Sequence, residues 1–176
     1  MVYMKIILLG YMGSGKSSIG KSLSKVTNIP FLDLDNVIEE KESISISEIF
    51  NAKGEIYFRK REQEILNNVL RDNQSLILAL GGGTPCYGTI MQNLNDMDDV
   101  TLIYLKASIQ ELTLRLWEER AHRPMIAHLK DKIQLEDFIR KHLFERNFYY
   151  NQASKKIDTD GFNISEIVQK IVVSLF

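Results

Sequence analysis

Short apolar runs alternate along the chain with longer segments that have helical periodicity. The run over residues 5–9 is apolar without alternation, the pattern of a strand that is buried on both faces. Further strand candidates are residues 29–33, 75–80, 100–105 and 156–159. Because helical segments separate these runs, the pattern predicts βαβ units and a parallel sheet between two layers of helices.

Capping signals mark the starts of several predicted helices. Ser45, Ser108 and Asn163 are each followed three positions later by a glutamate, as in a capping box. The predicted helices cover residues 46–51, 55–72, 108–120, 135–153 and 163–175, and Gly54 interrupts the pattern between the first two. The segment from residue 122 to 132 is polar, contains Pro124 and has no periodicity, so we expect a mobile loop there.

Composition narrows the class of protein. The chain has 176 residues, 44% of them hydrophobic and 26% charged, which suits one domain, residues 1–176, with its own core. Its 22 basic and 23 acidic residues give a net charge of -1, whereas a nucleic-acid-binding domain is usually strongly basic. No apolar run approaches the roughly 20 residues of a membrane span, and the N-terminus has no signal-peptide pattern. We therefore expect a cytoplasmic protein that binds neither nucleic acid nor membranes.

Residues 10–17, GYMGSGKS, fit the phosphate-loop pattern G-x-x-x-x-G-K-[ST]. Glycines let such a loop turn tightly around phosphates, and its N–H groups and the following helix supply positive potential. Lys16 can reach the β- and γ-phosphates, and the hydroxyl of Ser17 can ligate Mg²⁺. For a chain of this composition, the expected number of chance matches to the four fixed positions is roughly 0.005. The motif follows a buried strand and precedes a helical segment, so we infer a nucleotide phosphate site rather than a glycine-rich turn.

The phosphate loop alone does not separate kinases from GTPases, ATPases or binding modules. Asp33 and Asp35 end the second strand, and the carboxyl ends of parallel strands share one edge of a sheet. One carboxylate can hold a water of Mg²⁺ there, and the other can accept a proton from an acceptor hydroxyl. The alternative is a pair of residues that caps the helix after Asp35.

Other candidate residues have both a functional and a plain structural interpretation. The third strand ends in three glycines, residues 81–83, which suit close approach of a ligand but also a flexible turn. Arg59 lies three residues before Glu62 and can form an ion pair that fixes its guanidinium or merely decorates the surface. Arg123 lies in the mobile loop and can close over phosphates or remain solvated. Arg146, taken alone, is interpreted as a surface residue.

In this order the motifs resemble those of the shikimate kinase family. The resemblance spans nearly the whole chain and rests on the combination of the phosphate loop, Asp-x-Asp, Phe-Arg-x-x-Glu, the triple glycine and Arg-Pro. The matching segments are Gly10–Ser17, Phe31–Asp35, Gly54–Glu62, Gly81–Gly83, Arg123–Ile126 and Glu145–Tyr150. The resemblance implies a three-layer αβα P-loop fold of the nucleoside monophosphate kinase type, with a five-stranded parallel sheet in the order 2-3-1-4-5. It also implies an acceptor-binding region at about 33–62 and a lid at about 120–132.

The resemblance implies that ATP, with Mg²⁺, phosphorylates the 3-hydroxyl of shikimate on the route to chorismate and aromatic amino acids. Asp35 would bind the shikimate hydroxyls and act as base or orienter, with Lys16 and Arg123 as its catalytic partners. Asp33 would hold the metal through water, and Ser17 would ligate it directly. The implied shikimate-binding residues are Asp35, Arg59, Gly82 and Arg146. The implied ATP-binding residues are Met12, Gly13, Ser14, Gly15, Lys16, Ser17 and Arg123.

Some points stay open at this stage. Phe148 stands where the family often has proline, and Met125-Ile126 replace the common Leu-Leu after Arg-Pro. The adenine could lie against Arg115 or Arg120, with the loop after Asp160 on its other side. The alternatives in function are another small-molecule kinase of this fold, such as gluconate kinase, and a catalytically silent nucleotide-binding module. The first would carry a histidine-containing segment after the acidic pair, and the second would lack one of Lys16, Asp35, Arg59 or Arg146. We expect a monomer.

Overall fold

The structure, a computed structural model, describes residues 4–175. Its sheet has five parallel strands in the order β2-β3-β1-β4-β5, which confirms the predicted order. The strands are β1 Lys5–Leu9, β2 Phe31–Asp33, β3 Leu76–Ala79, β4 Val100–Lys106 and β5 Lys155–Asp158. The helices are α1 Lys16–Thr27, α2 Leu34–Glu42, α3 Ile46–Asp72, α4 Ile90–Asn95, α5 Ile109–Glu119, α6 Lys132–Tyr150 and α7 Ile164–Leu175, with short 3-10 turns η1 Thr84–Cys86 and η2 Arg120–His122.

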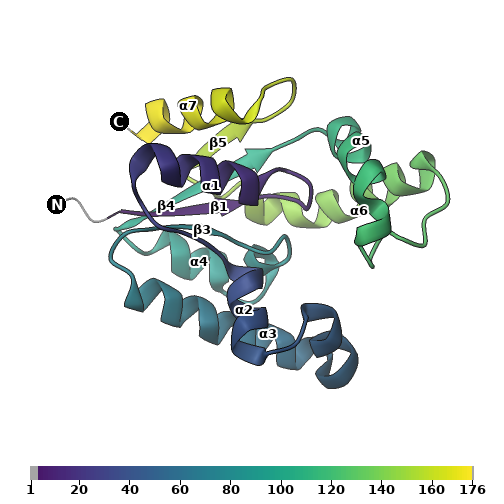
Figure 1. The fold of residues 1–176 in the computed structure, drawn as a ribbon, viewed down its shortest axis with the longest axis horizontal. Coiled ribbons are helices and arrows are strands. Elements are labelled where there is room, and N and C mark those ends of the chain that lie inside the picture. Colours follow the sequence, from purple (N-terminus) through teal and green to yellow (C-terminus); the bar gives the residue numbers. More distant parts are fainter. Residues whose placement is uncertain (1–3, 176) are drawn as a thin grey trace.

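Two apolar cores lie on the two faces of the sheet, which makes the fold three-layered. In β1, Ile6 and Leu8 pack against α1 and α7, whereas Ile7 and Leu9 face the core that the other helices build. In Figure 1, α1 and α7 lie on one side of the strands, and α3 and α4 lie on the other. The unbroken apolar run of β1 therefore reflects burial on both faces, as its pattern predicted.

The helix boundaries follow the caps. The side chain of Ser45 accepts a hydrogen bond from the N–H of Glu48, and Ser108 does the same for Glu111. Asp131 caps α6 by accepting from the N–H of Gln134 at 2.8 Å, so this helix begins three residues before the predicted Leu135. The short helix α4 and the turns η1 and η2 were not predicted, because three to six residues give too little periodicity.

Gly54 bends α3 as the sequence predicts. It has φ 79° and ψ 173° inside a segment that is otherwise helical on both sides. A Cβ at this position would meet no atom of residues 4–175 within 4 Å, so the glycine is needed for its backbone conformation and not for lack of space. α3 is therefore two helical segments joined at one residue.

Gly20, inside α1, lies against the ring of Phe31. A Cβ at Gly20 would be 2.2 Å from Cε2 of Phe31, a distance that no side chain could keep. We expect Gly20→Ala to destabilise the protein by about 1 to 3 kcal/mol, because overpacking outweighs the helix propensity that alanine gains. Urea unfolding measures this, and Lys21→Ala, at the exposed next position, is the control. A Gly20→Ala variant as stable as the wild type would contradict the predicted contact.

In the part of the chain from residue 4 to 175, no helix is both long and apolar enough to cross a bilayer.

Candidate active site

The carboxyl ends of β1, β2 and β3 meet at one edge of the sheet and open into a cavity of about 810 Å³. The loop after β1 supplies residues 12–17, β2 supplies Asp33 and the following Asp35, and the segment after β3 supplies Gly81 and Gly82. The predicted phosphate, metal and proton-accepting residues therefore lie together at the edge where open parallel sheets bind ligands.

The loop after β1 has the shape of an anion site. Gly10 has φ 147°, and a Cβ there would be 2.7 Å from the carbonyl oxygen of Leu105. The N-cap residue of α1 is Gly15, which has no side chain to bond the first N–H groups of the helix, so these groups suit an anion. The Oγ of Ser14 is buried and has no hydrogen-bond partner among the residues that the structure describes. Since buried hydroxyls are normally paired, this loop fits a phosphate that would supply the partner.

Lys16 is held inside this loop. Its Nζ donates to the carbonyl oxygens of Gly10 at 2.8 Å and Tyr11 at 3.0 Å. Burial lowers the pKa of Lys16 to about 8, and the nearby carboxylates of Asp35 and Asp33 limit the decrease. An anion bound here would therefore stabilise the charged form of Lys16, which the protein alone stabilises only weakly.

Asp33 performs two structural tasks with its two oxygens. Oδ2 accepts a hydrogen bond from the hydroxyl of Ser17 at 2.5 Å, and Oδ1 accepts from the N–H of Asp35 at 3.2 Å as the N-cap of α2. The helix-capping interpretation is thus correct for Asp33, and it is compatible with a metal role.

The donor set fits Mg²⁺ bound together with phosphates. Ser17 and Asp33 offer two hard oxygen ligands side by side. Between residues 4 and 175, no group of three or more His, Cys, Asp or Glu side chains gathers into a metal site. Mg²⁺ needs no such cage, because it keeps several waters and binds through one or two carboxylates and substrate phosphates.

Asp35 lies in the first turn of α2 and faces Gly81. A Cβ on Gly81 would be 2.8 Å from its Oδ1, so only glycine leaves room for the carboxylate. Burial, with the charges of Asp33 and Glu62, raises the pKa of Asp35 to about 6, although Lys16 opposes the increase. The carboxylate is therefore ionised at neutral pH but is a far better proton acceptor than an ordinary aspartate.

Arg59 is fixed by the predicted ion pair. Its Nη1 lies 2.7 Å from Oε2 of Glu62, whose side chain is only 1% exposed. The other oxygen of Glu62 accepts from Oγ1 of Thr84 at 2.5 Å. No motif in the sequence marks Thr84 as a site residue, although its position directly after the triple glycine is a signal. The guanidinium of Arg59 packs so closely on Gly83 that a Cβ there would be 2.6 Å from Nη2.

Arg146 comes from α6 and lies beside Gly82. Its Nη1 is 3.4 Å from where a Cβ of Gly82 would be, and its guanidinium carbon is 5.5 Å from the centre of the Tyr11 ring. The carbonyl of Gly82 accepts from the hydroxyl of Tyr150 at 2.5 Å. The structure therefore corrects the interpretation of Arg146 as a surface residue, since it is half-buried. The triple glycine is a packed turn, with Asp35, Arg59 and Arg146 each against one of its members.

Arg123 lines the same cavity from the segment that follows η2. Its Nε and Nη2 contact Oε2 of Glu119 at 2.9 and 2.5 Å. Arg115 also lines the cavity, and its Nη1 donates to the carbonyl of Gly13 at 3.3 Å. Arg120 instead stacks on Trp117, with its guanidinium carbon 3.7 Å from the ring centre, and is not among the residues that line the cavity. Of the two candidates for the adenine, only Arg115 lies at the cavity.

The predicted residues are thus divided between two adjoining places. The cavity is lined by the loop residues, both aspartates, Gly82 and Arg123. Arg59 and Arg146 are not part of its lining but lie against Gly83 and Gly82. The arrangement puts the cavity with its phosphate-loop motif next to the guanidinium groups of Arg59 and Arg146, and Asp35 packs on the same glycine turn.

Comparison with known proteins shows which family this chain matches. The model of the shikimate kinase family matches residues 12–176. The shikimate kinase of Flavobacterium johnsoniae is 51% identical over 168 residues, which are 96% of each chain. That of Flavobacterium psychrophilum is 48% identical over 172 residues, which cover 98% of this chain and 99% of the relative.

Solved structures show the same likeness. The crystal structure of shikimate kinase from Bacteroides thetaiotaomicron has a TM-score of 0.88 at 32% identity and 98% coverage of both chains. Shikimate kinase from Acinetobacter baumannii in complex with shikimate has a TM-score of 0.85 at 29% identity, covering 98% of this chain and 92% of that one. A gluconokinase from Sinorhizobium meliloti, with a TM-score of 0.55 at 16% identity, shares the fold alone.

Proposed function

Because the chain belongs to the shikimate kinase family, we propose that it transfers the γ-phosphoryl group of ATP to the 3-hydroxyl of shikimate, giving shikimate 3-phosphate and ADP. The observation that carries this proposal is the packing of Asp35, Arg59 and Arg146 on the three glycines beside the phosphate loop. A carboxylate beside two guanidinium groups suits an acceptor that has both a hydroxyl and a carboxylate. The product would serve chorismate and aromatic amino-acid biosynthesis.

At the nucleotide end, the backbone of residues 12–17 would bind the phosphates, and Lys16 would neutralise them. The buried hydroxyl of Ser14, which has no hydrogen-bond partner in the part of the chain that the structure describes, supports this placement. The cavity is also lined by Arg115, Phe162 and Asn163. Because Arg115 is held in place by Glu111 at 2.8 Å, its planar guanidinium offers the adenine a fixed face.

Mg²⁺ would be held by Ser17 directly and by Asp33 through water. Bound there, it would neutralise the charge that develops on the phosphate oxygens during transfer. The contact between Ser17 and Asp33 supports this assignment, because it presents both oxygens at one place.

At the acceptor end, Arg59 and Arg146 would bind the shikimate carboxylate in a planar fork, with Gly82 beneath the ring. Asp35 would accept the proton of the 3-hydroxyl while the hydroxyl oxygen forms a bond to the γ-phosphorus. The bond between the γ-phosphorus and the β,γ-bridging oxygen breaks, and ADP leaves with that oxygen. Lys16 would stabilise the charge on the transferring group, and Arg123 would join it once the lid, residues about 120–132, closes. Arg123 now contacts Glu119, so closure would exchange that partner for phosphate.

Every residue assigned to this reaction comes from one chain, which supports the proposal of a monomer. We also propose a cytoplasmic location, where ATP is available and a free cysteine such as Cys86 stays reduced.

An acceptor panel tests the proposal. The purified protein with MgATP is offered shikimate, quinate and gluconate, and ADP release is followed with a coupled assay. We expect turnover with shikimate at least 100-fold above that with the other two acids. Turnover of gluconate with none of shikimate would overturn the assignment, and ATP binding without any acceptor turnover would favour a silent nucleotide-binding module.

A further inference from the structure

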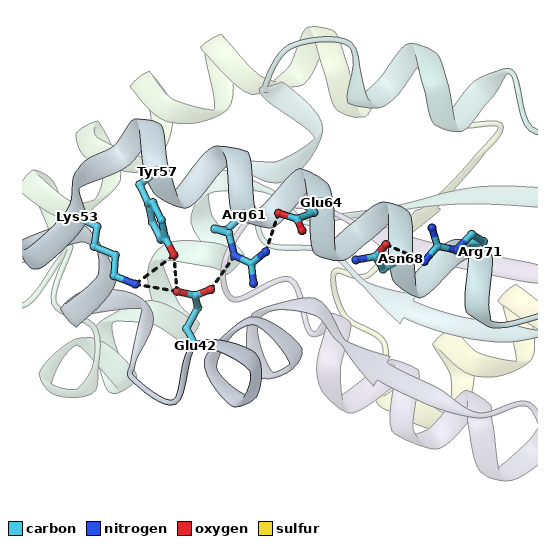
Figure 2. A network of polar contacts seen from close by, with 7 residues as sticks. All are labelled: Glu42, Lys53, Tyr57, Arg61, Glu64, Asn68 and Arg71. Carbon is cyan, nitrogen blue, oxygen red and sulfur yellow. Dashed lines mark hydrogen bonds and ion pairs between the residues drawn. The ribbon is translucent and has the colours of Figure 1, made fainter.

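A second group of polar side chains lies outside the cavity, between α2 and α3. Its centre is Glu42, the last residue of α2, whose side chain is only 6% exposed. Glu42 accepts from Nζ of Lys53 at 3.0 Å, the hydroxyl of Tyr57 at 2.8 Å and Nε of Arg61 at 2.7 Å. We call these four residues the Glu42 clamp, and Figure 2 shows the three donors of α3 converging on the carboxylate. The hydrogen bonds from Arg61, Tyr57 and Lys53 hold the pKa of Glu42 at about 2, so it stays charged.

The Glu42 clamp crosses the bend in α3. Lys53 lies just before Gly54, whereas Tyr57 and Arg61 lie after it. A Cβ on Gly54 would meet no atom of the described residues within 4 Å, so contacts on either side of Gly54 must hold the angle of the bend. The ring of Phe50 packs on that of Phe58 across the bend, with centroids 4.6 Å apart, and the Glu42 clamp adds polar contacts. Through Glu42, the end of α2 is bonded to both segments of α3.

The same two helices carry the proposed acceptor-binding residues. Asp35 lies in the first turn of α2, and Arg59 and Glu62 lie on the second segment of α3. Arg59 is two residues from both Tyr57 and Arg61, so it projects from roughly the opposite side of the helix. The Glu42 clamp therefore bonds one side of α3 to α2, and the opposite side of α3 carries the guanidinium group of Arg59.

We propose that Glu42 is a positioning residue, which fixes α2 against both segments of α3 and so sets the spacing between Asp35 and Arg59. This inference rests on the proposed function, because it requires these two residues to bind opposite ends of one acceptor. A cyclic acceptor cannot adjust its length, and a displacement of about 1 Å can cost on the order of 10²-fold in rate. The clamp thus acts on acceptor binding and turnover, and it leaves the nucleotide loop untouched.

The decisive variant is Glu42→Gln, which keeps the shape of the side chain and removes its charge. We expect KM for shikimate to rise about 10-fold and kcat to fall, while KM for ATP stays within about 2-fold of the wild type. The matched control is Glu64→Gln. Glu64 contacts the same Arg61 at 2.6 Å, but its side chain is 54% exposed and it forms no hydrogen bond or ion pair with α2 in the described part of the chain. This control should leave both KM values unchanged.

If Glu42→Gln does not fold, Tyr57→Phe still tests the proposal, because it removes one hydrogen-bond donor to Glu42 and no charge. It should raise KM for shikimate by about 2- to 3-fold without altering KM for ATP. Hydrogen exchange followed by mass spectrometry gives a readout apart from activity. Residues 46–61 should exchange faster in Glu42→Gln than in Glu64→Gln, and residues 10–27 should exchange equally in both.

The outcomes separate the two proposals. Wild-type protein that does not phosphorylate shikimate would refute the proposed function. Suppose instead that the wild type phosphorylates shikimate but Glu42→Gln has an unchanged KM for shikimate. This result would refute the role of Glu42 alone, and Tyr57→Phe gives the same test if Glu42→Gln fails to fold. Parallel increases in both KM values would also refute it, since they would indicate general destabilisation.

Discussion

Replacing Lys16 by methionine is expected to lower kcat/KM for ATP by about 10³-fold or more, because an ammonium group that stabilises the transferring phosphoryl group is lost. Methionine has nearly the same length and no charge, so the phosphate loop keeps its volume. Steady-state kinetics with shikimate as acceptor measure the change. Activity within about 10-fold of the wild type would show that Lys16 does not neutralise the phosphates.

The control for Lys16→Met is thermal unfolding. Burial lowers the pKa of Lys16 to about 8 in the folded protein, below its usual value of 10.5, so folding disfavours its charged form. Removing that charge relieves a cost, which offsets the lost hydrogen bonds to Gly10 and Tyr11, and Tm should stay near the wild-type value. The same pKa predicts that ATP binding to the wild type weakens as pH rises from 7 to 9, because the free protein loses this charge.

Replacing Asp35 by asparagine is expected to lower kcat by about 10² to 10⁴-fold, the usual contribution of a general base, and to leave ATP affinity within a few-fold. In the wild type, kcat/KM for shikimate should fall below pH about 6, because protonation of Asp35 removes the proton acceptor. The variant should lack this acidic limb. A pH–rate profile in parallel with ATP titration measures both, and a near-normal kcat would remove Asp35 from the role of base.

The same substitution should make the protein more stable at neutral pH. Folding raises the pKa of Asp35 from 3.8 to about 6, so the folded state binds the proton more tightly than the unfolded chain. The stability from this group is fully present below pH 3.8 and is lost as pH rises through 6. At pH 7.5, Asp35→Asn should therefore gain about 2 to 3 kcal/mol in the free energy of unfolding, and the gain should vanish near pH 4.

Asp98→Asn is the control for this gain, because Asp98 is an exposed carboxyl. Urea unfolding at pH 7.5 and pH 4 should leave it close to the wild type at both. An Asp35→Asn variant that is less stable at pH 7.5 would contradict the raised pKa of Asp35.

The sequence predicts those parts of the molecule that local patterns determine. The five strands follow from apolar runs, the bend at Gly54 from an interrupted helix, and the pair of Arg59 and Glu62 from spacing along one helix. Arg146 could not be placed in this way, because its partial burial depends on packing against Tyr11, which is far away in the sequence. The Glu42 clamp was missed for the same reason, since its donors lie 11 to 19 residues beyond Glu42.

Asp33 illustrates the other limit of local patterns. Its position before a helix suggested either a cap or a metal role as alternatives, and the structure shows that the cap uses one oxygen and leaves the other on Ser17. A motif shows which residue type stands at a position, but only the three-dimensional contacts show which partner each of its atoms bonds.

The division of the Asp33 carboxylate also determines how rigid this corner of the site is. With one oxygen bonded to the start of α2 and the other to Ser17, the side chain cannot rotate freely. Its conformational entropy is lost when the protein folds, so little remains to be lost when ligands arrive. The corner is therefore preorganised, and its selectivity depends on a fixed geometry to which an incoming ligand must conform.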